Sequence, residues 1–133
     1  MSLAPIRDGL FVEDRGTPKL VTGACDGCAR MHFPATDTCP YCAASCTATR
    51  LVGPNGTVRL CTIVRRPPPG YVGDVPYGFG VVALADAEIE VITRLSASSL
   101  EDLAPGRAVR LALVPVRIAD DGEEALTWTF EAR

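Results

Sequence analysis

The sequence is poor in the features that mark membrane, secreted and nucleic-acid-binding proteins. No uninterrupted apolar run approaches the ~20 residues that a membrane-spanning helix needs, so we expect no membrane partner. Residues 1–16 contain no apolar stretch of secretory length, which predicts a protein of the reducing cytoplasm. Lysine and arginine number 13 against 16 aspartates and glutamates, a net charge of −3. That charge disfavours a nucleic-acid partner, which only a local basic patch could hold.

The sequence also lacks a recognisable set of catalytic groups. A Cys–His nucleophilic pair needs hydrogen-bond reach and an orienting group, and no spacing places the single histidine, His32, beside a thiol. Cys61 lies in a predicted strand, where a free cysteine usually behaves as a small apolar residue. Cys46 is interpreted as a bystander thiol, with a spare metal ligand as the alternative. We therefore predict that the chain is not catalytic alone.

What the sequence does contain is a specific metal-binding motif, CDGCARMHFPATDTCPYC, at residues 25–42. A Cys-x-x-Cys spacing lets one tight turn direct two thiolates at one ion, and two such knuckles complete the tetrahedral shell of Zn²⁺. Four protein ligands leave no open position for substrate or water, so the predicted zinc is structural. The predicted ligands are Cys25, Cys28, Cys39 and Cys42.

Neighbouring residues refine this interpretation. We expect a positive φ at Gly27 in the first knuckle, a preset φ at Pro40 in the second, and Phe33 covering the metal from the loop between them. Iron in a rubredoxin-like site is the alternative ion, because metal softness does not separate iron from zinc. Disulfides are a further alternative, which the expected reducing compartment disfavours.

Composition favours a folded chain, since 47% of residues are hydrophobic and 22% charged. A length of 133 residues allows one domain or a small metal module joined to a second small domain. We assign residues 1–17 to an N-terminal arm in which only the apolar Leu10–Val12 is expected to dock. A segment of ~40 residues rarely builds an adequate core, so a metal would stabilise residues 18–49 as a rubredoxin-like zinc ribbon. Residues 50–133 form the second domain.

Alternation of apolar and polar residues predicts strands throughout this second domain. In the first, one face would carry Val58, Leu60, Thr62 and Val64 and the other Arg59, Cys61, Ile63 and Arg65. The third would bury Ile89, Val91, Thr93 and Leu95. A capping box beginning at Ser98 predicts one helical turn, and residues 120–122 predict a hairpin turn. Five strands with a short helix between the third and fourth follow the element order of an OB-fold barrel. The strands are predicted at residues 57–65, 80–85, 88–95, 109–113 and 126–130.

The order of these parts resembles the domain-of-unknown-function-35 family of zinc-ribbon and acyl-CoA-associated OB-fold proteins. The similarity covers residues 20–132 and rests on the two knuckles, on LVGPNGTVRLCTIV, on RRPPPGYVGDVPYGFGVVALAD and on SSLEDLAPGRAVRL. It implies a mainly β fold, with the ribbon followed by a five-stranded barrel. It also implies a non-catalytic accessory or scaffold subunit of an acyl-CoA-processing complex that borders the CoA thioester site. The implied partner is a thiolase, a thiolase-like acyltransferase or another acyl-CoA enzyme such as a hydratase.

A proline-rich loop at residues 65–80 is the candidate contact surface for a partner or for CoA. Consecutive prolines favour polyproline II, and two arginines could meet CoA phosphates through charge-assisted hydrogen bonds. A stiff surface loop with solvent-facing arginines is the alternative. The candidate contacts are Arg65, Arg66, Tyr71, Pro76 and Tyr77.

Two functions of other classes stay open. One is a nucleic-acid-binding zinc-ribbon and OB-fold protein, which the net charge disfavours. The other is a rubredoxin-like electron carrier, which the visible absorption of iron would reveal.

Overall fold

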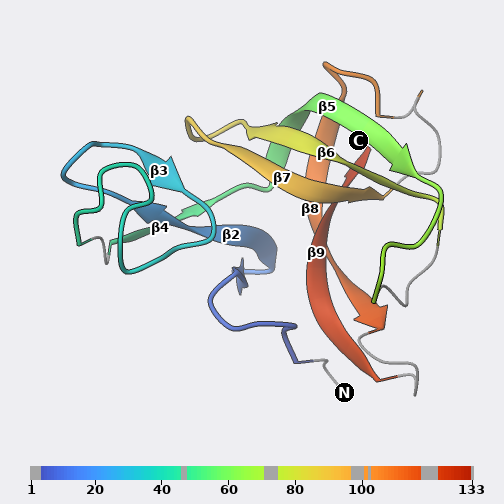
Figure 1. Cartoon of the computed structure of the whole chain (residues 1–133), viewed down its shortest axis with the longest axis horizontal. Coiled ribbons are helices and arrows are strands. Elements are labelled where there is room, and N and C mark those ends of the chain that lie inside the picture. Colours follow the sequence, from blue (N-terminus) through green and yellow to red (C-terminus); the bar gives the residue numbers. More distant parts are fainter. Residues whose placement is uncertain are drawn as a thin grey trace.

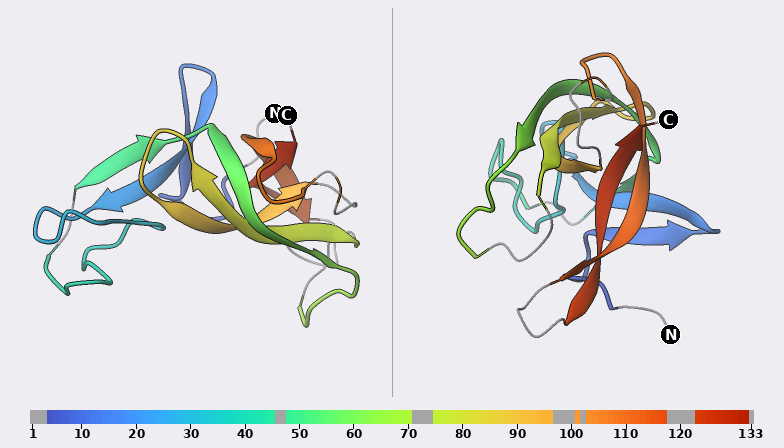
Figure 2. Two further views of the ribbon diagram at one scale, coloured as in Figure 1. Left: turned by 90° about the horizontal axis from the view of Figure 1, so that it is seen from above. Right: turned by 90° about the vertical axis from the view of Figure 1, so that its right-hand side faces the viewer.

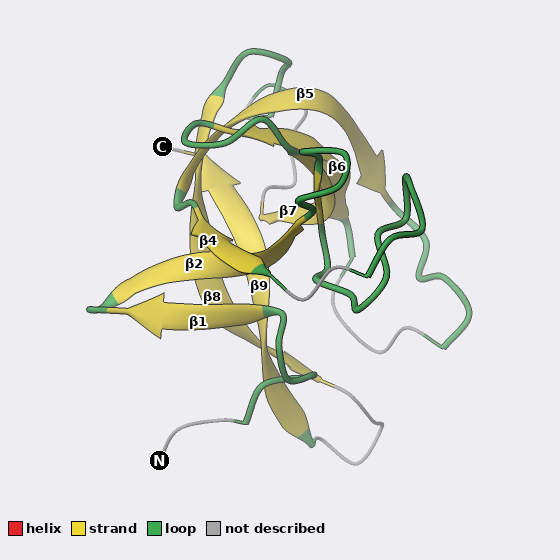
Figure 3. Ribbon diagram, turned by 90° about the vertical axis from the view of Figure 1, so that its left-hand side faces the viewer, coloured by secondary structure: helices red, strands yellow, loops and turns green. Residues whose placement is uncertain are grey.

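A computed structural model describes residues 4–45, 48–70, 75–96, 101, 103–117 and 123–132. These residues form strands and loops without a helix (Figure 3), so none of them belongs to a helix that could span a membrane. The helical turn predicted after Ser98 falls mostly outside the described ranges, and the hairpin turn at residues 120–122 falls wholly outside them. The strands are β1 (Phe11–Asp14), β2 (Thr17–Ala24), β3 (Met31–His32), β4 (Thr49–Val52), β5 (Asn55–Val64), β6 (Tyr77–Leu84), β7 (Glu90–Ser96), β8 (Ala108–Arg117) and β9 (Glu124–Ala132).

The N-terminal half is a small antiparallel sheet built around β2 (Figure 1). Strand β2 pairs with β1, with β4 and, through its last two residues, with β3. Its central residue Leu20 lies opposite both Phe11 and Val52, and all three side chains are buried. The expected docking of the apolar arm segment is confirmed for Leu10 and Phe11, which are buried because they pack into this core.

The C-terminal half is a closed barrel in the order β5-β6-β7-β9-β8 (Figure 2). Strand β8 returns to pair with β5, and every pair is antiparallel except β7 with β9. This order, with one parallel closure, is that of an OB-fold barrel. The predicted fold class, a mainly β chain with a ribbon followed by a five-stranded barrel, is confirmed.

The predicted hairpin around Asp86 and Ala87 is also confirmed, since β6 and β7 pair antiparallel on either side of it. Its predicted inner face is buried at all four positions, because alternation by two sends these side chains to one side of the pleat. They are Ile89, Val91, Thr93 and Leu95.

In β5 the predicted alternation is wrong after Val58. The pairing of β5 with β6 shifts between Val58 and Leu60, so Arg59 is an extra residue in a β-bulge. One extra residue reverses the inward and outward sides of everything that follows. Val58 is buried, but Leu60, predicted on the same face, is 64% exposed, and Cys61 and Ile63 pack against the core instead.

Aromatic side chains join the two halves. Among the described residues, strand β9 pairs with β7 at Leu95 and Ser96. Trp128 lies on β9 before these pairs, and its indole N–H donates to Thr93 Oγ1 at 3.1 Å. The rings of Phe11 and Phe33 contact Trp128, with centroids 6.3 and 5.4 Å away. The expectation that Phe33 covers the metal is therefore wrong. Its apolar ring is stabilised instead by an edge-to-face contact with the barrel.

The strand junction between the halves is short and held from both sides. Only Gly53 and Pro54 separate β4 from β5. Lys19 Nζ donates to the Gly53 carbonyl at 2.6 Å, and the Gly53 N–H donates to the Asp86 carboxylate at 3.1 Å. A charge-assisted contact from the ribbon and another from the barrel thus fix this connection.

Candidate metal centre and contact surfaces

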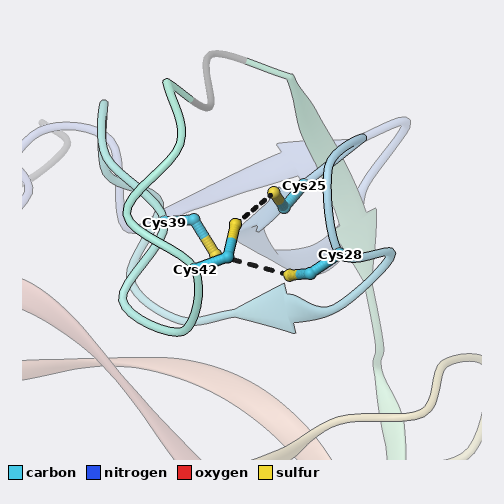
Figure 4. A group of neighbouring side chains, drawn as sticks. All are labelled: Cys25, Cys28, Cys39 and Cys42. Atoms are coloured by element: carbon cyan, nitrogen blue, oxygen red, sulfur yellow. Dashed lines mark hydrogen bonds between the residues drawn. The ribbon is translucent and has the colours of Figure 1, made fainter.

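The four predicted ligands converge on one point (Figure 4). Cys25 Sγ lies 3.6 Å from Cys42 Sγ, Cys28 Sγ lies 3.7 Å from Cys39 Sγ, and all four sulfurs lie within 4.8 Å of one another. Sulfurs placed 2.3 Å from a tetrahedral ion are ~3.8 Å apart, whereas disulfide sulfurs are ~2.05 Å apart. The cysteines are free, and their spacing fits one metal ion bound by all four.

Two equivalent turns position these sulfurs. In the first, which follows directly from β2, the Ala29 N–H donates to the Cys25 carbonyl at 2.9 Å. In the second, the Ala43 N–H donates to the Cys39 carbonyl at the same distance. Ala29 and Ala43 have φ values of 62° and 63°, and Gly27 is not among the residues with positive φ. The expectation for Gly27 is therefore wrong, because the turn reverses just after the second cysteine of each pair.

Hydrogen bonds split the pKa values of the four thiols. The Cys28 N–H is the largest influence on Cys25, and with the neighbouring thiols it lowers the Cys25 pKa to about 6 against the effect of burial. The Ala44 N–H lowers the pKa of Cys42, but the Cys25 thiol, burial and the other thiols together raise it to about 11. Thiolates this close repel one another, so some keep their protons unless a cation is present. A bound metal ion would allow all four to ionise.

His32 and the thiol of Cys61 do not form a Cys–His pair. His32 is buried in β3, where its Nε2 accepts a hydrogen bond from the Thr36 N–H at 3.3 Å and its ring occupies the space that a side chain at Gly23 would need. Cys61 donates instead to the Thr62 carbonyl at 3.6 Å, and burial raises its pKa. Cys46 lies outside the described residues.

The candidate contact residues of the proline-rich loop lie at the end of the β5–β6 hairpin. Arg65 and Arg66 are exposed just after β5, and Pro76 is exposed just before β6. Tyr77 is half-buried, with the Arg94 guanidinium 5.0 Å from the centre of its ring. Tyr71 lies outside the described residues, and a role of the loop in contact stays a prediction.

An apolar groove on the outer face of β5, β6 and β7 was not predicted. It has a volume of about 320 Å³, and its walls include Leu60, Phe79 and Ile92, whose side chains are 64%, 41% and 69% exposed. Gly80 forms part of the lining, and a Cβ there would lie 2.0 Å from the Leu60 carbonyl oxygen. The sequence signal was hidden because the bulge at Arg59 turns Leu60 outward.

Comparison with known proteins places this arrangement in a family. Residues 49–114 match the family described as the C-terminal OB-fold domain of ChsH2. A DUF35 domain-containing scaffold protein from Pyrococcus furiosus is 27% identical over 103 residues, which cover 77% of this chain and 74% of that protein. The chain belongs to the DUF35 family of OB-fold proteins.

Solved structures share the fold of this DUF35 protein. The structure titled Ltp2-ChsH2(DUF35) aldolase has a TM-score of 0.62 and 21% identity, covering 86% of this chain and 84% of that one. A DUF35 protein of unknown function from Sulfolobus solfataricus has a TM-score of 0.54 and 13% identity, covering 86% of this chain and 76% of that one. The family resemblance seen in the sequence is thus confirmed, and these two likenesses extend over ribbon and barrel.

Proposed function

We propose that this DUF35 protein is a non-catalytic accessory subunit that organises an acyl-CoA-processing enzyme complex, with a thiolase or thiolase-like acyltransferase as its partner. The observation that carries this proposal is the apolar groove, because large apolar side chains gathered in solvent mark protein-binding surfaces. Two relatives support a subunit role: one is described as a scaffold protein, and the other forms part of an aldolase assembly named with ChsH2. The proline-rich loop would border the CoA thioester site of the partner.

The metal in this proposal is structural Zn²⁺, bound by Cys25, Cys28, Cys39 and Cys42. Four thiolates around one ion leave no position for water or substrate, so the ion would stabilise the ribbon rather than act in catalysis. The thiols must stay reduced to bind it, which supports a cytoplasmic location. Metal analysis of the purified protein should give one zinc per chain without visible colour. A red, iron-loaded protein would instead support the electron carrier.

The docking proposal is tested at Ile92, the most exposed of the large apolar residues in the groove. We expect Ile92→Asp to abolish co-purification with an acyl-CoA enzyme from the native cell, because a carboxylate would be buried against an apolar partner. Val12→Asp is the matched control, since Val12 is 39% exposed on β1 of the ribbon. Both variants should keep the wild-type melting temperature.

Two results would contradict the proposed subunit role. A wild-type chain that purifies alone, and that leaves the activity of every thiolase-family enzyme unchanged when removed, is not a subunit of such a complex. Turnover of an acyl-CoA by the isolated chain would likewise contradict a non-catalytic role.

A further inference from the structure

A second recess lies between the ribbon and the barrel, away from the groove residues. It has a volume of about 590 Å³, within the range of small-molecule sites. Residues of the ribbon form most of it, and Glu88 of the β6–β7 turn completes it from the barrel side. We call it the ribbon cleft. Its lining comprises Ala24, Ala29, Arg30, Met31, Tyr41, Arg50 and Glu88.

Two guanidinium groups give this cleft a positive character in a chain whose net charge is −3. Among the described residues, neither Arg30 nor Arg50 forms an ion pair, and Glu88 is the one acidic group in the lining. Arginine presents a planar fork of donors that matches phosphate oxygens in pairs. The cleft therefore has donors for an anion and no carboxylate that already satisfies them.

The two arginines are also held in place. Arg50 donates to the Asp86 carbonyl at 3.0 Å across the ribbon–barrel boundary, and its other nitrogen lies 3.9 Å from Met31 Sδ. The Arg30 guanidinium lies 5.1 Å from the centre of the Tyr41 ring. Side chains that are already ordered lose less entropy when a ligand binds.

The rest of the lining argues against a bare anion as the ligand. The Tyr41 side chain is 56% exposed, an unusual position for an aromatic ring, and Met31 and two alanines add apolar surface. Aromatic rings and guanidinium planes both stack on flat bases. The cleft thus offers a charged part and a flat apolar part side by side.

We propose that the ribbon cleft binds a nucleoside phosphate, with Arg30 and Arg50 donating to phosphate oxygens and the base against Tyr41. A free nucleotide and the nucleotide end of a CoA thioester share this chemistry, and the test separates them. The inference does not depend on docking at the apolar groove, because the two sites have no lining residue in common.

The experiment is calorimetric titration of the metal-loaded chain with adenosine 3′,5′-bisphosphate, AMP, CoA and inorganic phosphate. We expect the nucleotides to bind more tightly than phosphate. Arg30→Gln and Arg50→Gln should each weaken nucleotide binding roughly tenfold, as expected for the loss of a charged hydrogen-bond donor. Tyr41→Ala should weaken nucleotide binding but leave phosphate binding unchanged. Arg117→Gln, an exposed arginine of β8, is the matched control and should change neither.

The remaining outcomes decide the source and the validity of the proposal. Equal affinity for CoA and the bisphosphate supports the nucleotide end of CoA as ligand, and tighter binding of AMP supports a free nucleotide. The proposal is overturned if no nucleotide binds at millimolar concentration, or if phosphate binds as tightly. It is also overturned if Arg65→Gln with Arg66→Gln abolishes binding while the cleft variants do not, or if single-stranded DNA binds far more tightly than any mononucleotide. Melting temperature and metal content verify that each variant is folded, and partner co-purification is scored separately.

Discussion

At the scale of single residues, the two alanines that follow the knuckles carry backbone conformations that glycine adopts more easily. Ala29 and Ala43 have φ values of 62° and 63°, in the left-handed region where an L side chain costs about 1–2 kcal/mol. Their N–H groups close the knuckle turns, so the strain is maintained by the hydrogen bonds that shape the metal site. The turn requires a left-handed backbone at the residue after the second cysteine of each pair, although that residue is alanine and not glycine.

Ala43→Gly should therefore stabilise the protein by about 0.5–1 kcal/mol, because the relief of strain exceeds the added entropy of the unfolded chain. Gly27→Ala is the control. A Cβ at Gly27 would meet its nearest neighbours at 3.6 Å, an ordinary contact, so little change is expected. Chemical denaturation of the metal-loaded variants measures both effects. Destabilisation by Ala43→Gly would contradict the proposed strain.

Cys39→Ser tests the metal site itself. Cys39 is buried at the centre of the cluster, and the loss of one ligand should weaken metal binding by more than about 100-fold and lower the melting temperature, because metal-binding energy here is folding energy. Cys61→Ser removes a thiol that is outside the cluster and should leave the metal content unchanged. Full metal content in Cys39→Ser would exclude this residue as a ligand.

At the scale of elements, the β5–β6 pair depends on the close approach of Leu60 to Gly80. A Cβ at Gly80 would overlap the Leu60 carbonyl oxygen, so Gly80→Ala must push two paired strands apart. We expect a loss of about 1–3 kcal/mol in the free energy of unfolding. Ile92→Ser, on the exposed face of the neighbouring strand, should change it by less than about 0.5 kcal/mol. An unchanged denaturation midpoint for Gly80→Ala would show that the strands can separate freely.

Elements were predictable where one local pattern decided the outcome. The alternation from Ile89 to Leu95 buried the predicted face, because β7 keeps a regular register with β6 there. The bulge at Arg59 was not predictable, since it arises where β5 curves to pair with both β6 and β8. Phe33 was misplaced for a related reason: an aromatic ring in a loop packs on whichever apolar surface the tertiary fold brings near.

The metal site and the ribbon cleft also differ in how far the sequence predicts them. The four cysteines were found because two Cys-x-x-Cys pairs encode their geometry locally. The ribbon cleft was missed because Arg30, Arg50 and Glu88 meet only after the β6–β7 turn reaches the ribbon. The signal available in the sequence was weak, since Arg30 lies inside the metal motif and Arg50 lies after it with no motif that links them.

At the scale of the whole molecule, stability should follow pH through the metal. Cys42, with a pKa raised to about 11, keeps its proton at neutral pH without metal, whereas Cys25, with a pKa lowered to about 6, is mostly ionised. A metal ion must displace the protons that remain on the thiols. The affinity of the site for the metal therefore falls as pH falls, by roughly tenfold per pH unit for each proton released. Below about pH 6 Cys25 also takes up a proton, and the loss becomes steeper.

Competition with a chelator between pH 8 and pH 5 measures this dependence. The melting temperature of the metal-loaded protein should fall with acidification over the same interval, and that of the chelated protein should change less. An affinity that is constant, or that rises on acidification, would contradict thiolate ligation.

The short junction at Gly53 and Pro54 has a consequence for protein engineering. The Gly53 carbonyl accepts a hydrogen bond from Lys19, and the Gly53 N–H donates one to Asp86. The junction is therefore fixed by residues that lie far from it in the sequence, one on each side. A chimaera that exchanged the N-terminal half at this boundary would separate these partners, even though the cut lies between strands. Shuffling the two halves among homologues should therefore succeed only when the residues at positions 19 and 86 are transferred as a matched pair.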